Sequence, residues 1–266
     1  MLVVVFTGWM LGAAAQAKEK RVLVYTRNGK GYVHDNIPAS IAALQQLGQQ
    51  LGLRVDTSSN PASFTDDNLR QYAALIFSNT NNSVFDNDAQ KVAMMRYIQA
   101  GGGFMGIHSA SGTERNWKWF KLMLGATFRR HPPFQPLRIH VLDRRHPATR
   151  GLPASWTTED ECYFFKEFNV NVHVLLVTDI REIRDDQPAD SVRQFSNQYP
   201  AAWCQEFDGG RVWYTALGHS AEDYSNPQYL AHLRAGLQWL LAKPALNYKR
   251  AYATQPEMDE MKWLDR

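Results

Sequence analysis

Hydrophobic residues along the chain alternate between short runs, as in buried strands, and repeats three or four positions apart, as on one face of a helix. The first strand-like run covers residues 21–26, and a helical repeat follows it at Ile37, Ile41, Leu44, Leu47 and Leu51. The alternation then continues with predicted strands at 53–56, 74–78 and 104–108, a capped helical segment at 64–69 and a helix at 86–100.

After residue 108 the alternation weakens. Four further runs predict strands with irregular connections, at 137–142, 173–178, 201–207 and 211–215, before a last helix at 227–241. Strands that alternate with helices, followed by a more antiparallel half, predict a doubly wound α/β sheet with an added sheet. The 266 residues, 44% hydrophobic and 21% charged, suit one medium-sized domain, which we place at 18–243, with a tail at 244–266.

Charge and loop composition argue against two classes of ligand. The formal net charge of +3 is spread along the chain without a long basic run, so nucleic acid is not an expected partner. The glycines around Lys30 lack a complete phosphate-binding fingerprint, so no nucleotide cofactor is expected. The 8 Trp, 11 Tyr and 13 Phe are expected mostly in the core, although aromatic rings in a cleft often stack on sugars.

The first residues resemble a secretory signal peptide. An apolar stretch at 2–15 is too short to cross a bilayer, and Ala15-Gln16-Ala17 forms a small-residue cleavage site. The stretch lacks the usual basic residue at its start, and a buried first helix is the alternative. We expect removal of residues 1–17 and a periplasmic or secreted protein without stable membrane insertion.

Export would place the two cysteines, Cys162 and Cys204, in an oxidising compartment. There they can form one disulfide bond. Two buried free thiols are the alternative, because an unpaired cysteine behaves as a small hydrophobic residue.

An apolar strand stops on His108, within a run of small residues at 101–110. Small residues let a strand turn sharply into a helix and present one side chain at the carboxyl edge of a sheet, as in a nucleophile elbow. His219 likewise follows the apolar strand at 211–215. Histidines at strand ends of one sheet are expected to converge, and we expect His34, His108 and His219 to lie within roughly ten ångströms of one another.

Six motifs in order along residues 21–241 resemble the ThuA-like, or trehalose-utilisation, family. They are Gly31-Tyr32-Val33-His34; Gly106-Ile107-His108-Ser109-Ala110; Gly125-Ala126-Thr127-Phe128 with His131-Pro132; Asp143 with His146-Pro147 and Gly151-Leu152-Pro153; Asp160-Glu161-Cys162-Tyr163; and Tyr214-Thr215-Ala216-Leu217-Gly218-His219. The family is similar in fold to class I glutamine amidotransferases. The resemblance therefore implies an α/β fold, a flavodoxin-like three-layer αβα sandwich with added antiparallel strands.

The amidotransferase elbow reads G-x-C-x-G, and His108 stands where its nucleophilic cysteine belongs. The second amidotransferase motif, H-x-E, is matched by His219 and Glu222, with the acid one position late. Without a thiolate no glutaminyl thioester forms, and Cys162 and Cys204 lie on other segments. Glutamine hydrolysis is therefore not expected, and the candidate catalytic residues are His108, His219 and Glu222.

Two chemistries suit the histidines. Neutral imidazole is the commonest ligand of divalent transition metals, so His34, His108 and His219 are candidate ligands of zinc or a similar ion. A nearby carboxylate or His131 is a candidate for a further ligand. Alternatively, His108 and His219 act as general acid and base, because imidazole exchanges protons near neutral pH. A third interpretation makes each histidine only a hydrogen-bonded structural residue.

Ligands of open α/β sheets bind at the carboxyl ends of the strands. The candidates for substrate binding are polar residues predicted near that edge: Arg27, His34, Ser109, His131 and Glu161. Arg27 is also a candidate for stabilising an enolate. Glu161, or Asp160 before it, is expected to orient a histidine or to accept hydrogen bonds from sugar hydroxyls, and a solvated acidic turn is the alternative.

The resemblance implies a carbohydrate-processing protein that acts on a glycoside or a 3-keto sugar, with a small-molecule carbohydrate as its partner. The expected step is proton abstraction next to a keto group, with His108 or His219 as base and a metal or Arg27 stabilising the enolate. The alternative is a non-catalytic sugar-binding module, in which the altered elbow only shapes a pocket. Residual hydrolase activity that uses water is a third interpretation.

Overall fold

The computed structural model describes residues 19–187 and 195–257. A nine-stranded sheet runs through it, and one half of this sheet is parallel. In spatial order the parallel strands are β2 (Leu53–Ser58), β1 (Lys20–Tyr25), β3 (Tyr72–Ser78), β4 (Gly103–Ile107) and β11 (Gly210–Thr215). This order, in which the first strand lies between the second and the third, is the flavodoxin-like form of a doubly wound sheet.

The other half of the sheet is antiparallel and continues from β11. Its strands are β10 (Gln198–Phe207), β9 (His173–Asp179), β6 (Gln135–Val141) and β7 (Ser155–Asp160). A separate two-stranded sheet pairs β5 (Thr127–Arg130) with β8 (Phe164–Lys166). The predicted antiparallel extension is therefore present, and the end of its strand β7 contacts the loop after β11 through hydrogen bonds described below.

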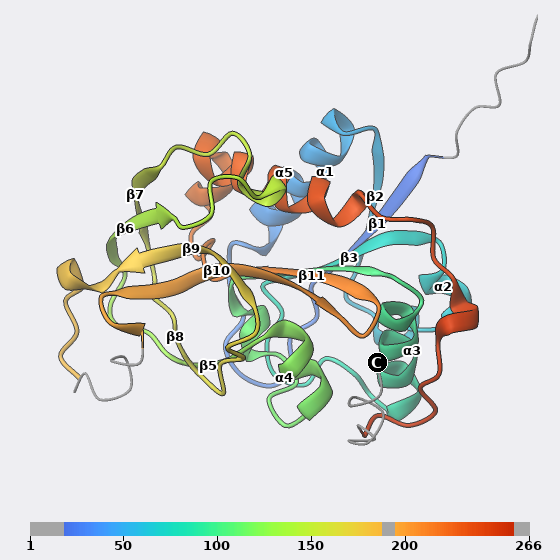
Figure 1. Ribbon diagram of the computed structural model, residues 1–266. Helices are drawn as coiled ribbons and strands as arrows, with labels where there is room; N and C mark the ends of the chain where they lie inside the picture. The colour runs from blue at the N-terminus through green and yellow to red at the C-terminus, as the bar shows by residue number, and fades with distance from the viewer. Residues whose placement is uncertain (1–18, 188–194, 258–266) are drawn as a thin grey trace, which may run out of the picture.

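Helices cover both faces of the sheet, which gives three layers (Figure 1). On one face lie α1 (Ile37–Gln50) and α5 (Pro227–Leu241), and on the other lie α3 (Asp88–Gln99) and α4 (Lys118–Leu124), with the short α2 (Asp66–Leu69) against α3. Short 3-10 turns occupy Pro61–Ser63, His108–Gly112, Pro147–Thr149, Ile180–Glu182, Glu222–Ser225 and Tyr248–Arg250. The predicted three-layer αβα sandwich is confirmed.

The parallel strands form because both of their faces are covered. Val22, Leu75 and Phe104 in this half have no exposed surface, as expected for strands packed between two helical layers. No helix within the described ranges is long and apolar enough to cross a membrane.

The two cysteines, Cys162 and Cys204, are buried and free, so the alternative without a disulfide holds. The first part of the predicted tail lies along α3, where the Gln99 side-chain oxygen accepts hydrogen bonds from the backbone nitrogens of Tyr252 and Ala253, both at 2.9 Å. The predicted signal peptide at 1–17 and the last residues of the tail lie outside the described residues. Cleavage after residue 17 and export stay predictions.

A candidate metal and acid–base centre at the sheet edge

His108 begins the turn that follows β4. Its backbone φ is +50°, in the left-handed region that residues other than glycine rarely adopt. Such strain at a strand end is typical of functional elbows. Gly106 lies just before it, and a Cβ there would sit 2.9 Å from Leu124 Cδ1 and 3.0 Å from Tyr214 Cδ2. The small residues therefore let the strand and its neighbours approach closely, as the sequence predicts.

Two side chains hold the loops that carry the other histidines. The Asn36 amide nitrogen donates to the carbonyl oxygens of Gly218 and His219, each at 2.7 Å, which ties the His34 loop to the loop after β11. The Asp160 carboxylate, at the end of β7, accepts hydrogen bonds from the backbone nitrogens of Gly218 at 2.7 Å and His219 at 3.4 Å. The histidine-bearing segments are thus fixed to one another by buried polar contacts.

Gly218 is essential to this arrangement, because its φ is +110° and a Cβ would collide with the Tyr229 hydroxyl. We expect Gly218→Ala to cost about 2 kcal/mol or more in the free energy of unfolding, measured by thermal or denaturant unfolding. Gly52→Ala is the matched control, since Gly52 has a φ of +65° but open space around it. Equal destabilisation by the two variants would contradict the packing argument.

Four side chains, from His34, His108, Glu161 and His219, meet at this edge. Each offers one ligand atom, and these atoms all lie within 4.8 Å of one another. The Glu161 carboxylate oxygen Oε2 is 3.2 Å from His219 Nδ1 and 3.5 Å from His108 Nε2. The ring centre of His34 is 4.8 Å from that of His108 and 5.4 Å from that of His219. The structure therefore brings together the three histidines predicted to converge, and adds a carboxylate.

The surroundings of His108 fix its orientation. Its Nδ1–H donates to the Ala216 carbonyl oxygen at 2.7 Å, so Nε2 carries the lone pair that faces the cluster. The Tyr163 hydroxyl donates to this Nε2 at 2.7 Å. A backbone carbonyl on the far nitrogen is the usual outer support of a metal-binding histidine.

Two predicted binding residues flank the cluster. The Ser109 hydroxyl oxygen lies 3.3 Å from His34 Nδ1. His131 Nε2 lies 3.3 Å from Glu161 Oε1, and 37% of the His131 side chain is exposed. The buried Ser109 therefore contacts His34, whereas the partly exposed His131 lies between the Glu161 carboxylate and solvent.

Burial and mutual contact set the charges of the cluster. Burial, together with the neighbouring His108 and His219, lowers the pKa of His34 to about 3. Burial also lowers the pKa of His108, against the opposing effect of Glu161. For Glu161, burial acts to raise the pKa, but the close contacts with the His108 and His219 imidazoles outweigh it, and the pKa lies well below its usual range. The hydrogen bond with Glu161 raises the pKa of His219.

This donor set fits a divalent metal ion. Neutral imidazole nitrogens and a carboxylate oxygen are ligands that zinc and similar ions accept, and three or four of them around an open position are typical of catalytic sites. The buried His34 and His108 are neutral near pH 7, and Glu161 is ionised, so each is in the protonation state that ligation needs. The cluster can therefore hold a metal ion.

The cluster opens into a cavity of about 510 Å³, within the range of small-molecule sites. Its lining consists of Tyr32, His34, Asn81, Asn82, Ser109, Gly112, Arg115, Phe128, His131, Glu161, Tyr163 and His219. Seven of these residues were not predicted as site residues, and they include Arg115 and Tyr163. Tyr163 belongs to a family motif, which is the signal that could have found it, whereas nothing in the sequence marks Arg115.

The structure does not bring Arg27 or Glu222 to the cluster. The Arg27 guanidinium pairs with the Asp86 carboxylate at 2.6 Å, and Arg27 does not line the cavity. Glu222 is exposed, and its carboxylate accepts a hydrogen bond from the Ser220 hydroxyl at 2.7 Å. The acid beside the histidines is Glu161, and the cation of the cavity is Arg115.

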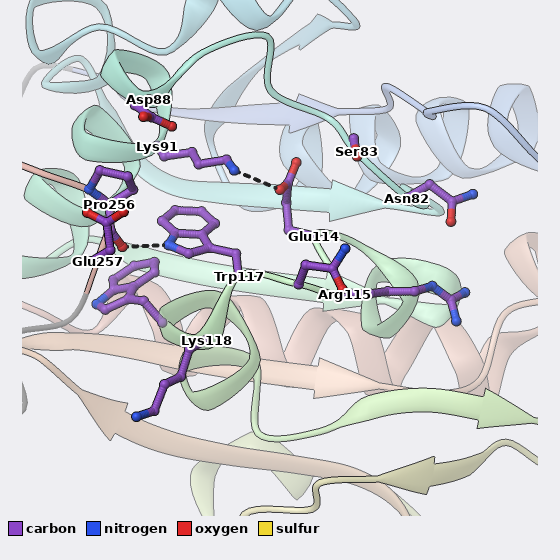
Figure 2. Close-up of a pocket in the computed structure, with 12 residues that line it drawn as sticks. Asn82, Ser83, Asp88, Lys91, Glu114, Arg115, Trp117, Lys118, Pro256 and Glu257 are labelled. Carbon is purple, nitrogen blue, oxygen red and sulfur yellow. Dashed lines mark hydrogen bonds and ion pairs between the residues drawn. The ribbon is translucent and has the colours of Figure 1, made fainter.

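A second cavity, of about 620 Å³, lies next to the first one, and Asn82 and Arg115 line both (Figure 2). Two of its charged groups pair with each other, since Lys91 Nζ is 3.3 Å from Glu114 Oε2. The tail reaches its edge, where the Trp117 indole nitrogen donates to the Pro256 carbonyl oxygen at 2.8 Å. We assign this cavity a structural role in docking the tail.

Similar folds occur in solved structures. A putative ThuA-like protein from Bacteroides uniformis is 23% identical, with a TM-score of 0.69 over 87% of this chain and 96% of that one. One from Parabacteroides merdae is 16% identical, with a TM-score of 0.66 over 89% and 100% of the two chains. A putative GMP synthase protein from Thermoplasma acidophilum is 11% identical, with a TM-score of 0.51 over 85% and 96%. These likenesses show a fold of the class I glutamine amidotransferase type.

A comparison with curated proteins finds no match. The family model described as trehalose utilisation, ThuA, matches residues 21–240, which is most of the chain and includes the strands of both sheets from the second residue of β1 onward. The chain therefore belongs to the ThuA family.

Proposed function

We propose that the protein is an enzyme of sugar utilisation that acts on a glycoside or a 3-keto sugar. The observation that carries the proposal is the meeting of three imidazoles and one carboxylate, with ligand atoms within 4.8 Å of one another. Three of these side chains, from His34, Glu161 and His219, line a cavity of about 510 Å³, which has room for a sugar unit, and His108 is buried behind them. The family description, trehalose utilisation, supports a carbohydrate as the ligand.

In this proposal His34, His108, Glu161 and His219 hold a divalent ion such as zinc. Such an ion acts as a Lewis acid, which stabilises the negative charge that develops on a carbonyl oxygen when a neighbouring proton is removed. Arg115 lines the same cavity and adds a positive charge for that oxygen or for a hydroxyl of the sugar.

His131 is the cavity histidine outside the cluster of four, and it is the proposed acid and base. Its Nδ1–H donates to the Pro132 carbonyl oxygen at 2.8 Å, so Nε2 is the nitrogen that takes up or releases a proton. This Nε2 contacts Glu161, and the exposed side chain passes the proton to solvent. Without a bound ion, His219 can act in the same way, because it is the more exposed of the cluster histidines.

Glutamine hydrolysis is not part of the proposal, because the elbow carries His108 in place of a cysteine. The two cysteines are elsewhere, and burial raises the pKa of both Cys162 and Cys204 to about 12. Neither thiol supplies a thiolate near neutral pH.

The test is metal content together with turnover of glycosides and their 3-keto forms. We expect about one zinc per chain, loss of turnover when a chelator removes it, and recovery when zinc is returned. His173→Ala is the matched control, since His173 is an exposed histidine that pairs with Asp143 away from the cluster. Full turnover after metal removal would contradict the metal-assisted mechanism. Sugar binding without turnover would favour the non-catalytic binding module.

A further inference from the structure

A third cavity, of about 650 Å³, shares one wall with the cavity of the metal cluster. That wall is His219, which lines both. The cavity lies between the loop after β1, the start of β6, the strand β7 and the turn before α5. His219 therefore lies between the reacting centre and this space.

An aromatic ring stands exposed at this cavity. Phe134 is 44% exposed, although large apolar side chains are mostly buried. Its ring centre is 5.6 Å from that of His219, so the ring stands next to the shared wall. An exposed aromatic face beside a reacting centre suits the apolar C–H groups of a polyhydroxylated unit.

The polar groups of the cavity select a type of ligand. Asp35 and Glu159 are exposed on its lining, and no ion-pair partner of either is found within 19–187 and 195–257. Thr157 and Thr158 also line the cavity, whereas no described lysine or arginine does. Carboxylates accept hydrogen bonds from hydroxyls and ammonium groups and repel anions.

The two cavities thus differ in charge on the two sides of His219. The cavity of the cluster is lined by Arg115 and three members of the metal-binding set, whereas the third cavity is lined by residues that carry carboxylates and hydroxyls. This division suits a ligand with two parts, one that reacts and one that only binds.

Resting on the proposed function, we propose that the third cavity is the subsite for the second, non-reacting unit of a glycoside. It takes an uncharged or cationic polyhydroxylated unit that lies against Phe134, and it rejects a unit that carries a carboxylate or phosphate. The substrate class is therefore a disaccharide-like glycoside with a neutral or amino-substituted second unit.

The experiment measures binding by calorimetry, with the full chain and added zinc. The probes are methyl α-glucoside, with one sugar unit, maltitol, with a neutral second unit, and maltobionate, with a carboxylate on that unit. We expect maltitol to bind about tenfold more tightly than the other two. Phe134→Ala should remove most of this gain and leave methyl α-glucoside unchanged, and Glu159→Gln should narrow the gap between maltitol and maltobionate.

Leu142→Ala is the matched control, because Leu142 is a similarly exposed apolar residue outside the three cavities. Equal binding of maltitol and methyl α-glucoside, absence of maltitol binding, or equal effects of Phe134→Ala on both probes would overturn the subsite. Binding does not require turnover. A failure of the subsite therefore leaves the zinc and turnover results as they stand, and a protein without turnover still tests the subsite.

Discussion

Replacement of His108 by asparagine should abolish tight zinc binding and lower sugar turnover by about a hundredfold or more, with little change in the melting temperature. Asparagine tolerates the left-handed backbone that His108 adopts, where φ is +50°. Its amide can still donate to the Ala216 carbonyl oxygen, which the His108 ring nitrogen Nδ1 contacts at 2.7 Å. What it lacks is Nε2, the nitrogen that faces the cluster.

His108→Ala removes the whole imidazole ring and therefore tests the structural role of His108 as well as its chemical role. It removes Nε2 and also leaves the buried Ala216 carbonyl without its side-chain donor, so we expect a further loss of about 1–3 kcal/mol in the free energy of unfolding. The double variant with His219→Ala should lose little more turnover than either single one, because residues that act as a unit are not additive. If His108 had only a structural role, His108→Ala would lower the free energy of unfolding, but the protein that stays folded would keep its turnover.

Glu161→Gln should weaken zinc binding by on the order of a hundredfold. The change keeps the size of the side chain but removes the negative charge that contacts His219 at 3.2 Å and His108 at 3.5 Å. Zinc affinity measured by competition with a coloured chelator provides the readout.

Glu222→Gln is the matched control for this variant. The sequence places Glu222 in the position of the amidotransferase acid, but the structure leaves it exposed and bonded to Ser220. We expect its zinc affinity to equal that of the unchanged protein. A loss of zinc by Glu222→Gln, with zinc kept by Glu161→Gln, would show that the acid of the site is Glu222.

The parallel half of the fold was predictable because its strands are continuous apolar runs and its helices repeat with helical spacing. β1 to β4, α1 and α3 all lie within a few residues of the predicted ranges. The strand β7 was missed, because Ser155–Asp160 is mostly polar and only its last residue is buried. An edge strand of this kind forms through pairing with β6, which local sequence does not reveal.

The candidate site, like the fold, could be predicted from the sequence only in part. The histidines were predictable because they follow strand ends, which meet at one edge of a sheet. The contact of Glu161 with two of them depends on the Asp160 hydrogen bonds that join the end of β7 to the loop after β11. Arg27 stands next to the predicted crevice in sequence, but Asp86, far along the chain, pairs with it instead. Such long-range contacts lie beyond what periodicity and spacing determine.

Anomalous diffraction at the zinc edge, from crystals of the zinc-loaded protein, will show whether His34, His108, Glu161 and His219 hold one divalent ion. We expect one strong peak between these four side chains, about 2.0–2.2 Å from the coordinating nitrogen and oxygen atoms. A cluster without a peak in crystals of protein that has been supplied with zinc, or zinc bound only at surface histidines such as His173, would contradict it.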